Sequence, residues 1–249
     1  MEKIYGKSAL LKDQPTPYCE GCYHGLIQKL CFEVVEEMQI ADQFVYGGAV
    51  GCNGMGAFTV NLDAYGTCHG RSPCVGTALK RLHPESVLML YQGDGDAASI
   101  GLGDTLHAAN RGEAFTVVMA NNSLYGMTGG QASPTTLPGM RTTTTRKGKE
   151  GPPMRVAELV ATLDAPYYVA RCSVHSAKYI LQFKKALKYA LTVQMEYGAY
   201  SFIEVLANCP TSSGIKPEDS MRYIEETAMK YFPVREFKRE GRPSGEVTR

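Results

Sequence analysis

The chain has 249 residues, with 26 Lys and Arg against 25 Asp and Glu and a formal net charge of +1. That balance gives no electrostatic argument for a nucleic-acid partner, and no apolar run approaches the roughly 18 residues that span a bilayer. The opening sequence MEKIYGKSALLKDQP lacks the apolar core of a secretory signal, so we expect a cytoplasmic protein, and the length allows one large domain.

The first elements of the chain are a polar arm, a tight turn and a helix. Residues 1–18 contain two prolines and predict an irregular arm. The turn YCEGCYHG at 18–25 contains Gly and carries Cys19 and Cys22. Apolar residues then recur on one face of 26–38, a pattern typical of an amphipathic helix.

A glycine-rich loop follows the first predicted strand. That strand covers 44–46, and the loop 47–56 has five glycines in ten residues, with Cys52 among them. Such a density of glycine indicates close backbone approaches. The next run, TCHGRSPCVGTALKRL at 67–82, predicts a loop that leads into a helix beginning near Pro73.

Two polar turns each follow a strand-like run in the central stretch. Strands are predicted at 86–92 and 114–120, with a helix at 97–110 between them. The first strand leads into GDGD at 93–96 and the second into Asn-Asn at 121–122. In a parallel sheet both turns lie at the carboxyl ends of strands, where open α/β sheets bind ligands.

The second half of the chain continues the alternation after a long loop. Residues 132–153 show no period, and a loop of that length is usually a lid, a binding loop or a partner contact. Helices are then expected at 155–163, 176–194 and 217–232, and strands at 167–174 and 200–207. The charged tail 235–249 is expected to be mobile or held only by a partner.

Together these elements predict an α/β fold with a mostly parallel sheet flanked by helices. We divide the chain into a main domain, residues 1–213, and a C-terminal helix with its charged tail, residues 214–249, that contacts a partner. No internal repeat is present.

The chemistry of the central turns favours a bound cation and diphosphate. Asp94 supplies a carboxylate between two glycines, and Asn122 supplies an amide oxygen after the next strand. Mg²⁺ prefers such oxygen ligands and commonly retains phosphate oxygens, and the helix after Asp96 would direct its N–H groups at the same diphosphate. Gly, Asp and Asn also dominate ordinary turns, but the placement of both turns after strands favours a site. No G-x-G-x-x-G opens a helix here, as a dinucleotide fingerprint would.

The motifs GDGD and NN-S-L-YGMTGGQ-SPTT resemble those of the thiamine-diphosphate-binding β subunit of 2-oxoacid:ferredoxin oxidoreductases. The resemblance implies a thiamine-diphosphate-binding fold in which Asp94 and Asn122 bind Mg²⁺ by their side chains and Leu124 by its carbonyl. It further implies that residues 128–131 shape the pocket near the reacting carbon. The cofactor-binding residues implied are Gly93, Asp94, Gly95, Asp96, Asn122, Leu124, Tyr125, Gly126, Met127 and Thr128.

Eight scattered cysteines raise the question of a metal site. A disulfide framework belongs mostly to short secreted chains, and a CxxC in a reducing compartment more often indicates metal or redox chemistry. Spacing alone fits structural zinc and an iron–sulfur cluster equally. The resemblance implies a 4Fe–4S cluster. Its ligands would be Cys19, Cys22, Cys52 and Cys209, whereas we assign no metal role to Cys31, Cys68, Cys74 and Cys172.

Two residues beside the first cysteine pair depart from the family pattern. Glu20 and Tyr23 stand where the family commonly has Pro and Gly. Bulk and charge at these positions would alter the potential of a cluster without removing a ligand.

Three further residues are candidates for the catalytic centre. His24 and His69 lie in motif loops, and with Thr128 we expect them to contact the cofactor or the substrate carboxylate. Arg71 fits a phosphate or carboxylate partner and a surface ion pair equally. The remaining histidines are expected to be structural: His83, His107 and His175.

The activity implied by the resemblance is the CoA-dependent oxidative decarboxylation of a 2-oxoacid to acyl-CoA and CO₂. Electrons would pass through the cluster to ferredoxin, with coenzyme A as co-substrate. The short chain and the 137–145 loop resemble the branched-chain (2-oxoisovalerate) and 2-oxoglutarate types more than the long pyruvate enzymes, and of these two we favour a branched-chain substrate. The alternative from another class is a zinc-stabilised, non-catalytic nucleotide-binding module.

The chain has room for the diphosphate-binding domain but not for a second domain of similar size. Thiamine enzymes need a glutamate against the aminopyrimidine, normally from such a domain. We therefore expect an α subunit to supply that glutamate and half the pocket, and γ and ferredoxin-like δ subunits to complete the assembly.

Overall fold

A seven-stranded sheet in the order β2–β1–β3–β4–β8–β7–β9 forms the centre of the molecule. We describe it from a computed structural model, for residues 6–239. The first six strands in this order run parallel, and β9 runs antiparallel to β7. The strands are β1 (Phe44–Gly48), β2 (Asp63–Gly66), β3 (Val87–Gly93), β4 (Thr116–Asn121), β7 (Tyr168–Ser173), β8 (Ser201–Leu206) and β9 (Arg235–Lys238). The predicted α/β fold with a mostly parallel sheet is confirmed.

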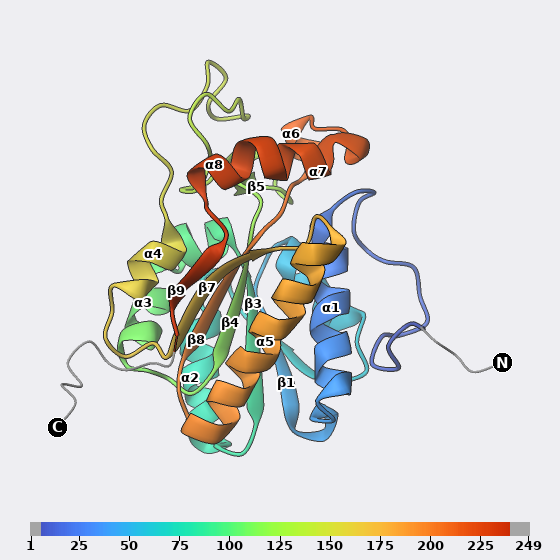
Figure 1. The fold of residues 1–249 in the computed structure, drawn as a ribbon, viewed down its shortest axis with the longest axis vertical. Coiled ribbons are helices and arrows are strands. Elements are labelled where there is room, and N and C mark those ends of the chain that lie inside the picture. Colours follow the sequence, from blue (N-terminus) through green and yellow to red (C-terminus); the bar gives the residue numbers. More distant parts are fainter. Residues whose placement is uncertain (1–5, 240–249) are drawn as a thin grey trace.

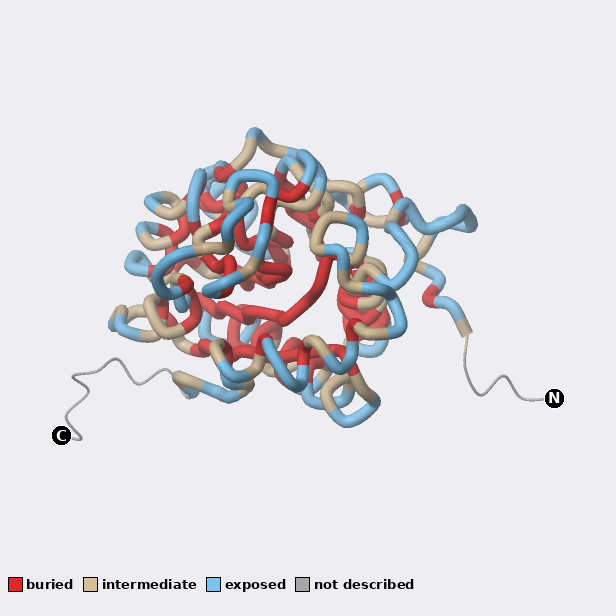
Figure 2. The backbone as a smooth tube through the Cα atoms, turned by 90° about the horizontal axis from the view of Figure 1, so that it is seen from above, coloured by how far each residue is buried: buried red, intermediate tan, exposed pale blue. Residues whose placement is uncertain are grey.

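Helices cover both faces of the sheet (Figure 1). Helices α1 (Tyr23–Glu37) and α5 (Ala177–Tyr197) cover one face, and α2 (Ser72–Leu82), α3 (Leu102–Asn110) and α4 (Val156–Ala161) cover the other. Successive residues of β3 serve the two cores alternately: Leu88 and Leu90 face α2 and α3, whereas Met89 and Tyr91 face α1. The central strands are therefore buried on both sides, as Figure 2 shows from above.

The register of the central strands brings the two polar turns together. Gly93 at the end of β3 pairs with Ala120 of β4, so the residues after each strand emerge side by side at the carboxyl edge. A small antiparallel pair lies after this edge, formed by β5 (Leu124–Tyr125) and β6 (Gln131–Ala132).

Glycine interrupts the helix predicted at 97–110. The chain forms a π-helical turn, Asp96–Ile100, whose last bond runs from the Gly101 N–H to the Asp96 carbonyl at 2.8 Å. Helix α3 begins after it. Gly101 is required here because a Cβ at this position would lie 2.5 Å from the Gly70 carbonyl oxygen, so two loops meet through their backbones.

The C-terminal segment lies across the carboxyl edge of the sheet (Figure 1). The helix predicted at 217–232 is divided into short turns, and Ile224, Ala228 and Phe232 pack on Leu137 and Leu206. These turns are a 3₁₀ turn Pro217–Asp219, α7 (Ser220–Tyr223), a π-helical turn Ile224–Ala228 and α8 (Met229–Tyr231). The other short helices are Ala41–Gln43, Cys52–Phe58 and α6 (Pro210–Ser213).

The prediction that the whole tail 235–249 is mobile or held only by a partner is wrong for its first part. Residues Arg235–Lys238 form β9 against β7. The Tyr168 hydroxyl donates to Glu236 at 2.9 Å, and Lys238 donates to two backbone carbonyls. Arg239 pairs with Glu236 at 2.9 Å, and residues 240–249 of the predicted tail lie outside the described residues. Among residues 6–239, no helix is both long and apolar enough to cross a membrane.

Candidate functional site

Asp94 is a buried carboxylate directly after β3. Its Oδ2 accepts hydrogen bonds from Ser133 Oγ at 2.6 Å and from Thr135 Oγ1. Burial raises the pKa of Asp94 to about 6, although these hydroxyls and two backbone amides oppose the shift. Within residues 6–239 its partners carry no positive charge, so a bound cation would supply the missing compensation.

A strained turn after β4 presents Asn122. Ser123 adopts φ 63°, in the left-handed region that costs an L-residue about 1–2 kcal/mol. Asn121 Oδ1 accepts from the Ser123 N–H at 3.1 Å, and Thr136 Oγ1 donates to the Ser123 carbonyl at 2.6 Å. Asn122 Oδ1 accepts from the Leu124 N–H at 3.2 Å. These bonds hold the turn in its strained conformation.

Both turns line one cleft with a cavity volume of about 70 Å³. Pockets that enclose a small molecule usually reach several hundred Å³, so the described residues enclose only part of a cofactor-sized space. The lining residues are His24, Val50, Gly51, Cys52, Asn53, His69, Gly93, Asp94, Gly95, Asp96, Asn122, Leu124, Tyr125, Gly126, Met127 and Thr128. The structure thus brings together every residue predicted to bind the cofactor or take part in catalysis, whereas residues 129–131, which were expected to shape the pocket, do not line this cleft.

The donors and the backbone of the cleft fit a metal-bound diphosphate. Oxygen atoms of Asp94, Asn122 and Leu124 are of the type that Mg²⁺ binds. At Gly95 a Cβ would lie 2.2 Å from the Tyr125 ring, whose hydroxyl donates to the Gly95 carbonyl at 3.2 Å. Only glycine fits this turn beneath Tyr125, because the ring occupies the space that a side chain would need.

Asp96 has a different role from Asp94, because protein donors already occupy both of its oxygens. Oδ1 accepts from His69 Nδ1 at 2.5 Å and from the Gly70 N–H at 2.6 Å, and Oδ2 accepts from Gln92 Nε2 at 2.8 Å. Asp96 therefore joins the 67–71 loop to the GDGD turn and orients the His69 ring toward the cleft.

The other two candidate catalytic residues differ in burial. His24 is buried, its Nδ1 lies 2.8 Å from the Tyr91 hydroxyl, and it stacks on Tyr18. Burial lowers the pKa of His24 to about 4, so the ring is neutral near pH 7. Thr128 is exposed, and its hydroxyl donates to Gln131 Oε1 at 2.6 Å.

Arg71 and the three histidines that were expected to be structural lie outside the cleft. Arg71 pairs with Asp104 at 2.6 Å on the surface, which matches the ion-pair alternative. His175 Nδ1 lies 2.8 Å from the Ser173 hydroxyl, His83 pairs with Glu85 at 3.4 Å, and His107 lies in α3.

The four candidate cluster cysteines come from three separate segments and lie within electrostatic range of one another. Burial, followed by the thiols of Cys209, Cys52 and Cys19, raises the pKa of Cys22 to about 12. A Cβ at Gly126 would lie 3.1 Å from the Cys209 sulfur, so the cysteine group borders the cleft. Within residues 6–239, however, no group of three or more His, Cys, Asp or Glu side chains is placed so that it could hold a metal ion.

Several hydroxyl and amide residues of the site were not assigned by the sequence interpretation. Ser133, Thr135 and Thr136 belong to the segment read only as a long loop, yet they bind Asp94 and the Ser123 carbonyl. Their dense Ser and Thr content within the SPTT motif was an available signal. Asn121 was a second such residue, because it stands beside the predicted ligand Asn122.

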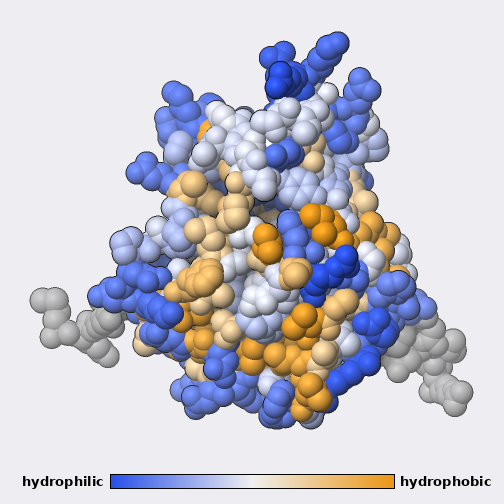
Figure 3. All heavy atoms as spheres, turned by 180° about the vertical axis from the view of Figure 1, so that it is seen from behind, coloured by the Kyte–Doolittle hydropathy of each residue, from blue (hydrophilic) through white to orange (hydrophobic). Residues whose placement is uncertain are grey.

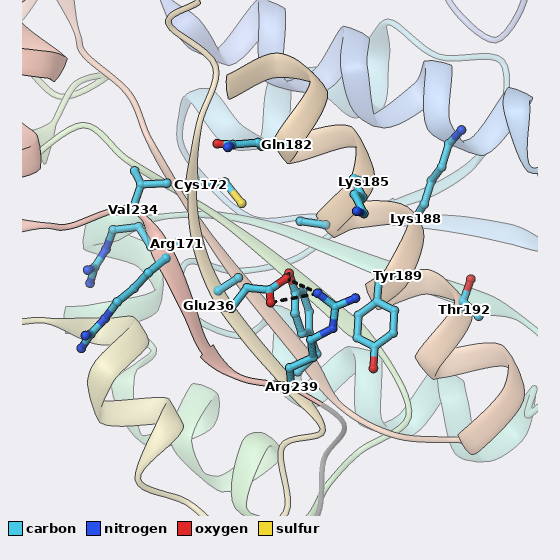
Figure 4. Close-up of a pocket in the computed structure, with 14 residues that line it drawn as sticks. Arg171, Cys172, Gln182, Lys185, Lys188, Tyr189, Thr192, Val234, Glu236 and Arg239 are labelled. Atoms are coloured by element: carbon cyan, nitrogen blue, oxygen red, sulfur yellow. Dashed lines mark hydrogen bonds and ion pairs between the residues drawn. The ribbon is translucent and has the colours of Figure 1, made fainter. Parts of the chain in front are cut away.

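A second groove lies elsewhere in the described part of the chain. It has a cavity volume of about 490 Å³, lies between α5, β7 and β9, and shares no residue with the cleft. The Glu236–Arg239 ion pair lies beside Tyr189 in this groove (Figure 4). The rear face of the molecule shows hydrophobic residues between hydrophilic ones (Figure 3).

Comparison with known proteins gives consistent results. Residues 49–205 match the family described as thiamine pyrophosphate enzyme, C-terminal TPP binding domain. Ketoisovalerate oxidoreductase subunit VorA of Methanothermobacter thermautotrophicus is 41% identical over 90% of this chain and 48% of its own length. 2-Oxoglutarate synthase subunit KorB of Archaeoglobus fulgidus is 35% identical over 85% of this chain and 76% of its own length. The chain thus spans about half the length of VorA.

A solved structure agrees with these relatives. A 2-oxoglutarate:ferredoxin oxidoreductase from Magnetococcus marinus, with 2-oxoglutarate, coenzyme A and succinyl-CoA bound, superimposes with a TM-score of 0.78. It is 25% identical, and the match covers 95% of this chain and 86% of that one.

Proposed function

Because the chain belongs to the thiamine pyrophosphate enzymes, within the 2-oxoacid:ferredoxin oxidoreductase β-subunit family, we propose that it forms the diphosphate side of an oxidoreductase active site. The reaction is the CoA-dependent oxidative decarboxylation of a 2-oxoacid, with ferredoxin as electron acceptor. The observation that carries this proposal is Asp94, a buried carboxylate without a cationic partner in the described residues that lines one cleft with Asn122.

In this proposal Asp94 and Asn122 hold Mg²⁺ by their side chains and Leu124 by its carbonyl. The turn at Gly95, which lines the cleft, and the N–H groups that follow it would accommodate the diphosphate. When bound, thiamine diphosphate supplies a carbon nucleophile for the 2-oxo carbonyl and an electron sink for decarboxylation. His69, oriented by Asp96, and the neutral ring of His24 line the part of the cleft where the substrate carboxylate would lie.

The cysteine group would hold a 4Fe–4S cluster next to the cofactor. Cys19, Cys22, Cys52 and Cys209 offer four sulfur donors, the usual set for such a cluster. The support is their mutual proximity and the approach of Cys209 to Gly126 in the cofactor cleft. Electrons would then pass one at a time from the reacting centre to the adjacent cluster.

For the substrate we propose a branched-chain 2-oxoacid. The ketoisovalerate oxidoreductase subunit is 41% identical to this chain, against 35% for the 2-oxoglutarate synthase subunit. For the missing wall of the pocket we propose an α subunit that supplies the glutamate against the aminopyrimidine, within an assembly that includes γ and δ subunits. The small cleft and the exposed Met127 at its edge support a partner there.

The test is anaerobic purification of the complex, followed by an assay of 2-oxoacid-dependent ferredoxin reduction with coenzyme A. We expect a brown protein that contains iron and sulfide and that uses 2-oxoisovalerate in preference to 2-oxoglutarate or pyruvate. Asp94→Ala should abolish the activity. A colourless protein with stoichiometric zinc and no such activity would instead support the non-catalytic nucleotide-binding alternative.

A further inference from the structure

We infer that Glu204 is a positioning residue for the metal-binding turn, acting through Asn121. This inference rests on the proposed Mg²⁺ site. Glu204 lies in β8 and is fully buried. Its Oε1 accepts from Asn121 Nδ2 at 2.7 Å, and its Oε2 accepts from the Ala157 N–H at 3.2 Å and pairs with Arg171 Nη2 at 2.9 Å.

Arg171 holds the Glu204 carboxylate from the adjacent strand. The two residues are register partners in β7 and β8, and the Arg171 side chain is also fully buried. It points away from α5 (Figure 4) and lies between the rings of Phe232 and Phe237, with its guanidinium carbon about 5 Å from each ring centre. Glu158 and the Pro233 carbonyl accept its remaining hydrogen bonds on Nη1 and Nη2.

Fold stability alone does not explain this arrangement. Removing two charges from water costs about as much as their attraction returns, and apolar residues of similar size often stabilise a core equally well. The buried pair instead provides something that an apolar core lacks, a fixed hydrogen-bond acceptor next to the ligand turn. That acceptor is occupied by Asn121.

The Glu204 acceptor determines which end of the Asn121 amide faces the turn. Because Nδ2 donates to Glu204, Oδ1 must face the Ser123 N–H, where it accepts at 3.1 Å. Ser123 is the left-handed residue between the proposed metal ligands Asn122 and Leu124. Without the acceptor the amide is free to rotate, and its NH₂ would then oppose the Ser123 N–H.

The variant Glu204→Gln tests this chain of contacts with little change of shape. A glutamine amide cannot satisfy both sides of the site: its NH₂ must face either Asn121 Nδ2 or the Arg171 guanidinium and the Ala157 N–H. We expect metal affinity to fall roughly 10- to 100-fold, as when other partners of metal ligands are removed. Asn121→Ala, which leaves the Arg171–Glu204 pair intact, should cause a similar loss, and the double variant should lose little more.

Glu113→Gln is the matched control. Glu113 is a buried carboxylate that accepts from Arg81 and Arg111, each at 2.7 Å, but it precedes the amino end of β4 and lines no part of the cleft. Like Glu204→Gln, this variant removes the charge of a buried carboxylate, although both arginine partners of Glu113 are exposed. We expect the metal affinity of the Glu113→Gln complex to stay within about twofold of wild type, although the folding stability of the chain falls.

The measurement is Mn²⁺ binding to the purified complex in the presence of thiamine diphosphate, followed by electron paramagnetic resonance. Weaker binding and an altered spectrum of bound Mn²⁺ in Glu204→Gln and Asn121→Ala, with Glu113→Gln unchanged, would support the inference. Wild-type affinity in both variants, while Asp94→Asn loses binding, would overturn it and leave the proposed site intact. Failure of the wild-type complex to bind Mn²⁺ would overturn the site and the inference together.

Discussion

Among single residues, Asp94 is expected to determine how the proposed metal site depends on pH. Its pKa is raised to about 6, so protons compete with the metal in a range where an ordinary aspartate is fully charged. We expect Mn²⁺ affinity to be constant above about pH 7 and to fall up to tenfold per pH unit below about 6. Titrations between pH 5 and 8 measure this, and an unchanged affinity down to pH 5 would contradict the assignment.

The raised pKa of Asp94 has the opposite effect on the stability of the metal-free protein, which increases as the pH falls. The folded protein binds this proton more tightly than the unfolded chain, whose aspartate has a pKa near 3.8. Asp94 therefore contributes increasing stability to the metal-free protein as the pH falls through about 6 toward 4. Burial thus makes the charged carboxylate costly until a cation is bound.

A second prediction at this scale concerns the cysteines. Replacement of Cys209 by Ser should remove most of the iron and sulfide from the anaerobically purified complex, because one of four sulfur ligands is lost. Cys74→Ser is the matched control, since that thiol is exposed and should leave the iron content unchanged. Iron and sulfide analysis decides between them, and full iron content in Cys209→Ser would contradict the cluster assignment.

Some residues of the site could be predicted from the sequence and others could not. Asp94 and Asn122 follow strands directly, so a local pattern located both. His69, a partner of Asp96, lies 27 positions from it, and Glu204 lies 83 positions from Asn121. Such contacts depend on the order of strands in the sheet, which a local pattern does not specify.

At the scale of elements, the contact between Gly70 and Gly101 holds two loops of the site together. Gly70 has φ 79°, and a Cβ there would lie 2.6 Å from the Gly101 backbone nitrogen. Gly214 has a similar φ of 73° but has no atom within 4 Å of an added Cβ. We expect Gly214→Ala to cost only the left-handed strain, about 1–2 kcal/mol.

Gly70→Ala should cost about 1–3 kcal/mol more than Gly214→Ala, because backbone atoms must move to admit the methyl group. It should also weaken thiamine-diphosphate binding, since the Gly70 N–H and His69 both bind Asp96. Urea unfolding of both variants gives the difference. Equal losses of stability would show that the contact is not tight.

Buried strands were predicted better than edge strands, for a physical reason. Strands β3, β4, β7 and β8 are buried on both faces and therefore have nearly continuous apolar sequences. Strand β2 was not predicted, and β9 was assigned to the tail, because both are short edge strands with polar residues. Their pairing depends on neighbours distant in sequence.

At the scale of the whole molecule, the cleft edge should contact a partner subunit. Met127 lines the cleft and is 51% exposed, whereas Leu82, 77% exposed, ends α2 at the opposite edge of the sheet. Met127→Asp should reduce recovery of the partner at least severalfold, because an interface would bury an unpaired charge. Leu82→Asp should not. Quantitative copurification measures both, and equal recovery would place the interface elsewhere.

The most direct test of the central claim is the thiamine diphosphate content of the purified complex. We expect about one cofactor per chain in the wild-type complex, almost none in Asp94→Ala, and weak binding by the isolated chain, because the chain forms only part of the pocket. Undiminished cofactor in the Asp94→Ala complex, or none in the wild type, would contradict the assignment of this cleft.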